Sequence, residues 1–479
     1  MSSLKNLAKQ TALYGLSNVV GRLLNFLLVP LYVRLFAPED YGIVTELYSY
    51  VALLNVIYTY GTETSFFRFS NESKDQAQGV YPTLFASLFA SSLLFSGVIW
   101  LASDLLANWM HYPDKGHYIR WFALILAFDA LASIPFSQLR QLQKPLVFAV
   151  LKLLNIGIVI GLNLFFLIYA PNHGLQFSEQ LQGVDAVFFS NLIANGVTLL
   201  LLLPWFPKNW EFLNFQLWKK MMQYSWPLLF VGLAFVVNEA LDRMLLKHWI
   251  QAENPERELG IYGAVYKLAM FMTLYTQSFR MGAEPFFHQR FRKEGNTEIF
   301  GHIGYAFLLI GLGFFLTVVG FRQEIGSTFL GKNHPEYLEG LSVVPFLFLA
   351  NLCLGMYYNF SVWYRLADQN RKGMWMSIGG AVITILGNAI LIPKYGYLGA
   401  GITTLVCYGS MMVVSYWWGQ RIFPIHYPIQ KMISAAVVVL GIWAIMEWND
   451  ALPIRLAGVI FAFVYLGWNL KKSLQPTSP

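Results

Sequence analysis

The chain has 479 residues, of which 56% are hydrophobic and only 12% are charged. Soluble domains usually carry about twice that share of charged residues, so the composition excludes a soluble protein. The net charge of +7 comes from basic residues scattered over short loops, which argues against a nucleic-acid partner. The two cysteines, Cys353 and Cys407, lie in apolar runs, and this argues against a disulfide framework or a metal site.

Apolar runs long enough to cross a bilayer follow one another along the chain. Taking about 20 apolar residues per span, the runs predict an all-α polytopic membrane protein with about 14 transmembrane helices. The first run carries Arg22 and has no small-residue cleavage site, so it is expected to be a retained helix and not a signal peptide. The expected helices lie at 11–36, 42–63, 80–103, 117–137, 146–170, 183–205, 224–248, 260–288, 299–320, 341–366, 373–393, 397–421, 431–447 and 451–470.

The distribution of basic residues gives an independent check on this topology. With the N-terminus inside, the cytoplasmic segments hold 19 of the 33 Lys and Arg residues and the outside loops hold 7. This asymmetry is the one that the positive-inside rule predicts, so both termini are expected in the cytoplasm. No loop is long enough to fold into a soluble catalytic domain, which disfavours an enzyme such as a glycan polymerase.

The two halves of the chain resemble each other weakly. The segments around Tyr41 and Tyr262, Arg140 and Arg365, and Gly161 and Gly387 pair at offsets of 221, 225 and 226 residues. Near-constant offsets indicate two parallel six-helix repeats around a central cavity, an architecture suited to alternating access. The expected division is a bundle at 1–205, a cytoplasmic connector at 206–223, a second bundle at 224–421, and two final helices with a short tail at 422–479.

Polar side chains inside the spans are costly in lipid, so they should face protein or a wet cavity. In the first helix Asn18, Arg22 and Asn25 share one face. In the eighth, one stripe contains Tyr262, Tyr266, Thr273, Gln277, Arg280 and Glu284. The alternatives are an Arg22 satisfied by a neighbouring helix and an Arg280–Glu284 salt bridge.

Further intramembrane charges are weaker candidates. Lys152 and Lys267 can line a cavity or extend to the interface, and Arg243 is expected to form a structural ion pair with Glu239 at i−4. The candidates for coupling to Na⁺ or H⁺ are Glu46, Glu63, Asp129 and Glu284. Cations outnumber convincing acids inside the spans, so the pattern favours an anionic substrate. A drug-cation exporter would need an acidic pair in one lobe.

These features resemble the multidrug/oligosaccharidyl-lipid/polysaccharide (MOP) exporter superfamily, and within it the Wzx-type oligosaccharide flippases of the polysaccharide branch. The segments that carry the resemblance are Asn18–Arg22 with Pro30–Tyr32, Pro38–Gly42, Asp242-Arg243 before Leu259–Ala264, and Lys267.

The resemblance implies a flippase, not an enzyme, in the bacterial inner membrane. It would move undecaprenyl-pyrophosphate-linked oligosaccharide units from the inner to the outer leaflet for O-antigen, capsule or exopolysaccharide assembly. Its partners would be the lipid-linked oligosaccharide, membrane lipids and polysaccharide polymerase machinery, and it would need no cofactor beyond a coupling ion. By the same analogy Arg22 and Arg280, then Lys152, Arg243 and Lys267, would hold the pyrophosphate. A lipid II flippase and a multidrug/cation antiporter of the same fold remain alternatives.

Overall fold

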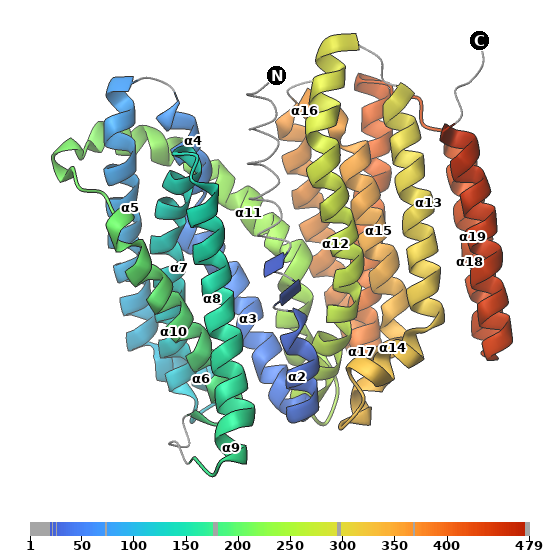
Figure 1. Cartoon of the computed structure of the whole chain (residues 1–479), viewed down its shortest axis with the longest axis horizontal. Helices are drawn as coiled ribbons and strands as arrows, with labels where there is room; N and C mark the ends of the chain where they lie inside the picture. Colours follow the sequence, from blue (N-terminus) through green and yellow to red (C-terminus); the bar gives the residue numbers. More distant parts are fainter. Residues whose placement is uncertain are drawn as a thin grey trace. The chain divides into compact units, whose positions relative to one another are not determined.

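The computed structural model describes residues 20–21, 23–24, 26–71, 74–175, 181–294, 298–366 and 369–474, and within these ranges the regular elements are helices (Figure 1). The first half contains α2 Leu28–Leu35, α3 Pro38–Thr59, α4 Thr62–Ser70, α5 Lys74–Leu101, α6 Ser103–Trp109, α7 Gly116–Gln141, α8 Pro145–Leu164, α9 Ala170–Asn172 and α10 Val184–Leu202. The second contains α11 Phe215–Trp249, α12 Pro255–Glu294, α13 Glu298–Gly320, α14 Arg322–Phe329, α15 Val344–Phe360, α16 Val362–Leu366, α17 Asn370–Ile422, α18 Ile429–Trp448 and α19 Leu452–Leu474.

The helices have the length and composition of membrane spans. Within the described ranges, nine helical segments are long and apolar enough to cross a bilayer. The longest, Arg371–Ile422, is broken at Gly396, whose φ of 55° lies in the left-handed region. The two helices expected at 373–393 and 397–421 meet at this glycine. The all-helical membrane fold is therefore confirmed, while the number of fourteen crossings stays a prediction.

The chain folds as two compact units. Unit 1 comprises Met1–Phe36 and Glu46–Val236, and unit 2 comprises Ala37–Thr45 and Val237–Pro479. Helices α3 and α11 each contribute residues to both units, because the division falls inside them. The start of α3 thus belongs to unit 2. The division into a bundle at 1–205, a connector at 206–223, a second bundle at 224–421 and two final helices stays a prediction.

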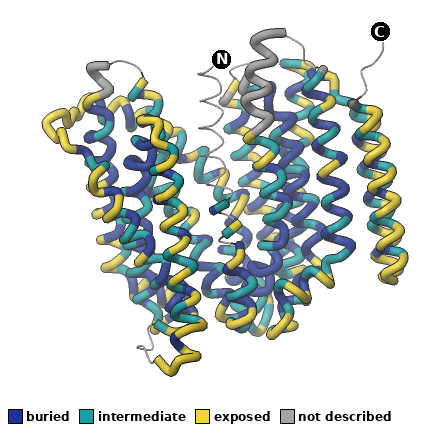
Figure 2. The backbone as a smooth tube through the Cα atoms, viewed as in Figure 1, coloured by how far each residue is buried: buried dark blue, intermediate teal, exposed yellow. Residues whose placement is uncertain are grey.

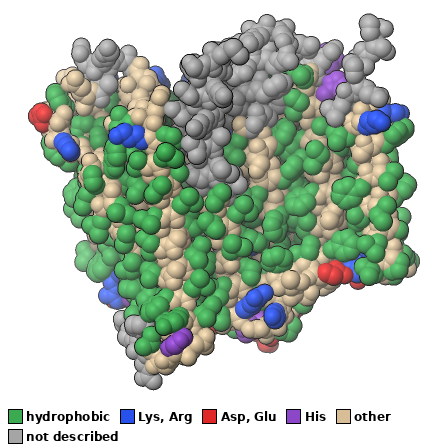
Figure 3. Space-filling model, in the orientation of Figure 1, with side chains coloured by type: hydrophobic (Ala, Val, Ile, Leu, Met, Phe, Trp, Pro, Cys, Tyr) green, Lys and Arg blue, Asp and Glu red, His purple; other side chains and the backbone are tan. Residues whose placement is uncertain are grey.

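Each unit has buried residues where its helices pack together and exposed residues on its outer helix faces (Figure 2). Many of the exposed residues are large and hydrophobic. In unit 1, α7 packs against α5 and α10, and α8 packs against α10. In unit 2, α15 packs against α12 and α17, and α13 packs against α18 and α19. Exposed residues such as Leu101 (89%) and Trp448 (93%) are apolar. Figure 3 shows hydrophobic side chains along the helices, as expected of a surface that faces lipid.

Glycines bring the start of α3 against α12 within unit 2. A Cβ on Gly42 would overlap the carbonyl oxygen of Glu256, and a Cβ on Gly260 would overlap that of Pro38. Small residues let helix backbones approach this closely in membrane proteins. The segments around Tyr41 and Tyr262, paired above as a repeat, therefore contact each other directly.

A buried carboxylate ties α10 to α7 in unit 1. Asp185 is 6% exposed, accepts a hydrogen bond from the Tyr118 hydroxyl at 2.6 Å, and lies 2.6 Å from His117 Nε2 and 3.6 Å from Lys115 Nζ. An acceptor shared among several buried or half-buried donors contributes more than an exposed ion pair.

We therefore expect Asp185→Ala to destabilise unit 1 by about 1–3 kcal/mol, because it leaves the Tyr118 hydroxyl without its acceptor. Asp104→Ala is the matched control, since the Asp104 side chain is 76% exposed and lies 3.9 Å from Arg120. Thermal unfolding of both variants in detergent checks this. Equal melting temperatures for the two variants would contradict it.

Candidate functional site

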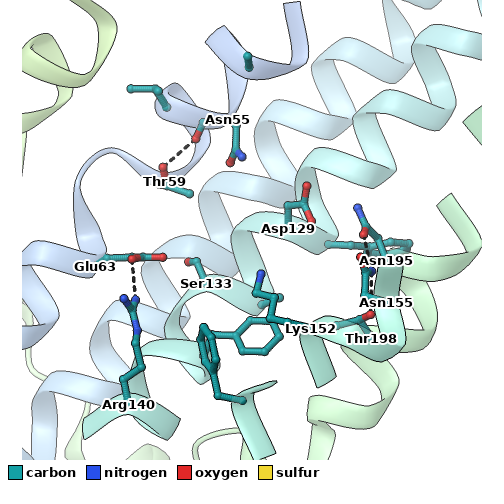
Figure 4. A pocket seen from close by; sticks show the side chains of 16 residues that line it. Asn55, Thr59, Glu63, Asp129, Ser133, Arg140, Lys152, Asn155, Asn195 and Thr198 are labelled. Carbon is teal, nitrogen blue, oxygen red and sulfur yellow. Dashed lines mark hydrogen bonds and ion pairs between the residues drawn. The ribbon is translucent and has the colours of Figure 1, made fainter. Parts of the chain in front are cut away.

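Unit 1 contains a cavity of about 500 Å³ lined by α3, α4, α7, α8 and α10. We call it the charged cavity. Figure 4 shows its lining, which contains apolar side chains and ten polar or charged residues: Asn55, Thr59, Glu63, Asp129, Ser133, Arg140, Lys152, Asn155, Asn195 and Thr198. Such a concentration of polar groups inside an apolar helical unit marks a functional site.

One side of the charged cavity is an ion pair. Arg140 Nη2 donates to Glu63 Oε2 at 2.8 Å and to Ser137 Oγ at 3.1 Å. The guanidinium also lies over the rings of Phe67 and Phe148, at 5.0 and 5.9 Å. These contacts hold Arg140 in one orientation and commit Glu63 to it.

The turn between α3 and α4 brings Glu63 to this position. Tyr60 and Gly61 have positive φ of 31° and 74°, and they end α3 and start α4 in a new direction. A Cβ on Gly61 would lie 2.9 Å from Leu228 Cβ, so glycine suits both the backbone conformation and the space.

Lys152 and Asp129 are the two other charged groups of the lining. Lys152 Nζ lies 4.2 Å from the centre of the Phe136 ring. Among the described residues, neither Lys152 Nζ nor the Asp129 carboxylate has a hydrogen bond or an ion pair within 4.0 Å. In the view of Figure 4 the lysine amine lies between the Glu63–Arg140 pair and the asparagines, with Asp129 near it. One cation and one anion of the cavity are thus available to a ligand.

The opposite side is a group of amides. Asn155 Nδ2 donates to Asn195 Oδ1 at 3.0 Å and to Thr198 Oγ1 at 2.9 Å, which links α8 to α10. On α7, Pro135 removes one helical hydrogen bond. Ser133 Oγ, on the same stretch, donates to the Ala130 carbonyl at 2.6 Å. The cavity can therefore bind a charged ligand that also accepts hydrogen bonds.

The described part of the chain contains no group of three or more His, Cys, Asp or Glu side chains that could hold a metal ion. The charged cavity itself offers carboxylates, amides and hydroxyls, which suit a monovalent cation or a proton better than a transition metal.

Of the predicted site residues, Lys152, Asp129 and Glu63 meet in the charged cavity. Asn18, Arg22 and Asn25 lie outside the described residues, and so does the side chain of Glu284. Glu46 is buried in unit 1 and accepts a hydrogen bond from the Tyr112 hydroxyl at 2.6 Å.

The polar stripe of α12 lies in unit 2, where several of its members bind neighbouring helices. Thr273 donates to Asn351 Oδ1 at 2.9 Å, and the Arg280 guanidinium lies 4.7 Å from the centre of the Tyr358 ring. Gln277, between them, is half-buried. These contacts join α12 to α15.

Arg243 forms its ion pair with a different residue from the one predicted. Its Nε lies 3.5 Å from Asp242 Oδ1, and its Nη2 donates to the backbone carbonyl of Glu239. Asp242 also accepts a hydrogen bond from Tyr262, and the guanidinium lies over the Tyr266 ring at 4.1 Å. At the predicted i, i+4 spacing Arg243 therefore contacts the backbone of Glu239, and the carboxylate with which it forms an ion pair is that of Asp242. Lys267, on the same helix as Tyr266, is half-buried.

The prediction from sequence grouped Asn155 with Lys152 on one side of the fifth helix but missed Arg140 and Asn195 as members of the same site. Arg140 was assigned to a cytoplasmic segment because it follows an apolar run. A signal was present, since Ser133, Ser137 and Arg140 recur on α7 at i, i+4 and i+7 and so share a face.

Within the described ranges the chain is helical, has nine segments of membrane-spanning length and contains a charged cavity in one unit, and these features define a polytopic membrane protein. Its fold is similar to that of a solved structure of the lipid II flippase MurJ in an inward closed conformation, with a TM-score of 0.74, 12% identity, and coverage of 96% of this chain and 99% of that one. It is also similar to a multidrug resistance MATE family transporter of the MOP superfamily in an inward-facing conformation, with a TM-score of 0.65, 14% identity, and coverage of 86% and 94%.

The family described as polysaccharide biosynthesis protein matches residues 7–290, which is more than half of the chain. The chain belongs to this family. No curated protein matches the sequence. The predicted membership of a polysaccharide family is thus confirmed, and the fold is similar to that of a transporter described as belonging to the MOP superfamily.

Proposed function

We propose that this protein is a flippase that moves undecaprenyl-pyrophosphate-linked oligosaccharides from the inner to the outer leaflet by alternating access. The observation that carries the proposal is the charged cavity, where Lys152 has no ion pair within 4.0 Å among the described residues and Arg140 lies on the same lining. Membership of the polysaccharide biosynthesis family supports a glycan-bearing substrate.

The cations suit the pyrophosphate of such a lipid. Ammonium and guanidinium groups form charge-assisted hydrogen bonds with phosphate oxygens. The Asn195 amide nitrogen, which makes no hydrogen bond among the described residues, can add a donor, while Asn155 holds the Asn195 amide in place. A head group with about two negative charges that moves outward gains roughly 2.3 kcal/mol per charge at 100 mV, so the membrane potential favours export.

The proposed setting follows from the same function. The protein would lie in the bacterial inner membrane with both termini in the cytoplasm, and would pass its product to polysaccharide polymerase machinery. The predicted roles of Arg22 and Arg280 in holding the pyrophosphate also remain proposals.

A leaflet-access assay in proteoliposomes tests the proposal. A fluorescent oligosaccharide on undecaprenyl pyrophosphate is the substrate, and quenching of outer-leaflet head groups is the signal. We expect protein-dependent flipping of this lipid and no transport of a lipophilic cation such as tetraphenylphosphonium. Transport of the cation alone would favour the multidrug/cation antiporter, and selective flipping of lipid II would favour that alternative.

Asp129 is our proposed coupling residue, because its carboxylate lies in the same cavity and the part of the chain that the structure describes offers it no ion-pair partner within 4.0 Å. Binding of Na⁺ or a proton there would remove one negative charge close to the pyrophosphate site. Two unit charges 4 Å apart interact by about 4 kcal/mol at an effective dielectric constant of 20, so the effect on an anion is large.

We therefore expect Asp129→Asn to bind undecaprenyl pyrophosphate about tenfold more tightly, a gain of about 1.4 kcal/mol, and to lose dependence on Na⁺ and pH. Equilibrium binding at several Na⁺ concentrations and pH values measures both effects. Unchanged Na⁺ and pH dependence in the variant would show that the coupling group lies elsewhere.

A further inference from the structure

A second cavity of about 550 Å³ lies beside the charged cavity in unit 1. We call it the amide cavity, because glutamines and an asparagine account for much of its polar lining. The residues that matter for the argument are Phe66, Gln78, Tyr81, Gln138, Gln141 and Trp205. The function proposed above does not use it.

The two cavities share α4 and α7. Glu63 of the charged cavity and Phe66 of the amide cavity are three residues apart on α4, a rise of about 4.5 Å along the helix. On α7, Arg140 lines the first cavity and its neighbour Gln141 lines the second. The two cavities are therefore adjacent along both helices.

Aromatic contacts continue from one cavity to the other. Arg140 lies over Phe67, Phe67 packs edge-on against Phe66 at 5.4 Å, and Phe66 packs against Tyr81 at 6.1 Å. The Tyr81 hydroxyl donates to the carbonyl oxygen of Trp205. This sequence of contacts fixes the aromatic side chains of the amide cavity relative to Arg140.

The polar groups of the amide cavity match hydroxyl groups. An amide side chain both donates and accepts hydrogen bonds, as a sugar hydroxyl does. Among the described residues, the side chains of Gln78 and Gln138 have no hydrogen-bond partner, so their capacity is left for water or a ligand. Aromatic faces beside amides can pack on the apolar faces of sugar rings. Among the described residues of the lining, Lys208 carries the one charge and the other polar side chains are neutral, so the lining suits a ligand rich in hydroxyl groups better than a cation.

We propose that the amide cavity binds the first sugars of the lipid-linked oligosaccharide while the charged cavity holds its pyrophosphate. The inference rests on the proposed function and names the part of the substrate that each cavity recognises. Because the first sugar is bonded directly to the pyrophosphate, adjacent sites on shared helices are what this substrate requires.

The experiment measures equilibrium binding of two radiolabelled probes to the purified full chain in detergent. One probe is undecaprenyl pyrophosphate that carries the glycan of the source organism, and the other is undecaprenyl pyrophosphate alone. The wild type is expected to bind the glycan-bearing probe about tenfold more tightly. Gln78→Ala and Gln138→Ala should each reduce this preference by about three- to tenfold and leave the affinity for the sugar-free probe unchanged.

Two control variants distinguish a failure of the glycan site from a failure of the proposed function. Gln223→Ala removes an exposed glutamine of α11 that lines neither cavity, and should change nothing. Lys152→Met should weaken both probes equally. Trp205→Leu gives a second variant of the amide cavity, in which the sugar-facing ring is lost.

Equal wild-type affinity for the two probes would overturn the glycan site. Gln78 and Gln138 variants that bind both probes equally weakly would also overturn it, because they would indicate a general contact with the lipid. If Lys152→Met still lowers both affinities in these cases, the proposed function stands without the glycan site. If neither probe binds the wild type, the proposed function itself fails.

Discussion

A Lys152→Met variant is expected to lose most of its transport activity while folding normally. The substitution keeps an unbranched side chain that can still pack on Phe136 but removes the charge that the pyrophosphate would contact. A hydrogen bond to a charged group contributes about 1.5–3 kcal/mol, so affinity for undecaprenyl pyrophosphate should fall by about ten- to a hundredfold. The variant breaks no ion pair within 4.0 Å among the described residues, although the Asp129 carboxylate loses a positive charge in the same cavity.

Lys219→Met is the matched control, because Lys219 is exposed on α11 and lines neither cavity. Flipping rate and binding affinity should equal those of the wild type. Flipping at the wild-type rate in both variants would show that Lys152 does not belong to the substrate site. Loss in both would indicate a general effect of net positive charge.

Substitution of Gly260 or Gly42 should have the largest effect on stability. Each added Cβ would overlap a backbone carbonyl, so the start of α3 would have to move away from α12. Overpacking of this kind costs typically about 1–3 kcal/mol, and a carbonyl oxygen cannot yield as a flexible side chain can. Gly260→Ala and Gly42→Ala should therefore both lower the melting temperature in detergent, and the double variant should cost less than the sum because the two share one contact.

The control for this prediction is Gly409→Ala on α17. Nothing lies within 4 Å of a Cβ at Gly409, and alanine favours a helix over glycine by roughly 0.5–1 kcal/mol. This variant should be as stable as the wild type or slightly more so. A Gly260→Ala protein that unfolds at the same temperature as Gly409→Ala would show that α3 and α12 are not in close contact.

The sequence predicted the helical fold well because the bilayer imposes it. Runs of about 20 apolar residues have few alternatives to a spanning helix. The boundary between 393 and 397 was found for the same reason, and Gly396 with φ of 55° is its physical basis. Contacts between residues far apart in the sequence are harder to predict. The grouping of Ala37–Thr45 with unit 2 depends on the close approach of α3 and α12 that Gly42 and Gly260 allow.

The candidate site was predicted only in part. Lys152, Glu63 and Asp129 were chosen for their charge inside apolar segments, and they line one cavity. Their sequence positions do not reveal that Arg140 pairs with Glu63, since that depends on the turn at Tyr60-Gly61. Nor do they reveal that the other two make no ion pair within 4.0 Å with any described residue. For Arg243, helical spacing indicated Glu239, whereas side-chain geometry selects Asp242. The helical spacing of charged residues thus predicts which helix faces are polar. Tertiary packing decides which of the charged groups remain available to bind a ligand.

Photo-crosslinking tests the central claim most directly, namely that the charged cavity holds the pyrophosphate of the lipid-linked substrate. A photoreactive group placed next to the pyrophosphate of an undecaprenyl lipid would be activated on the purified protein, and the modified peptides identified by mass spectrometry. We predict modification within α7 (Gly116–Gln141) and α8 (Pro145–Leu164), suppressed by excess unlabelled lipid and by Lys152→Met. Modification that is confined to helices of unit 2, or that excess lipid does not suppress, would contradict the account.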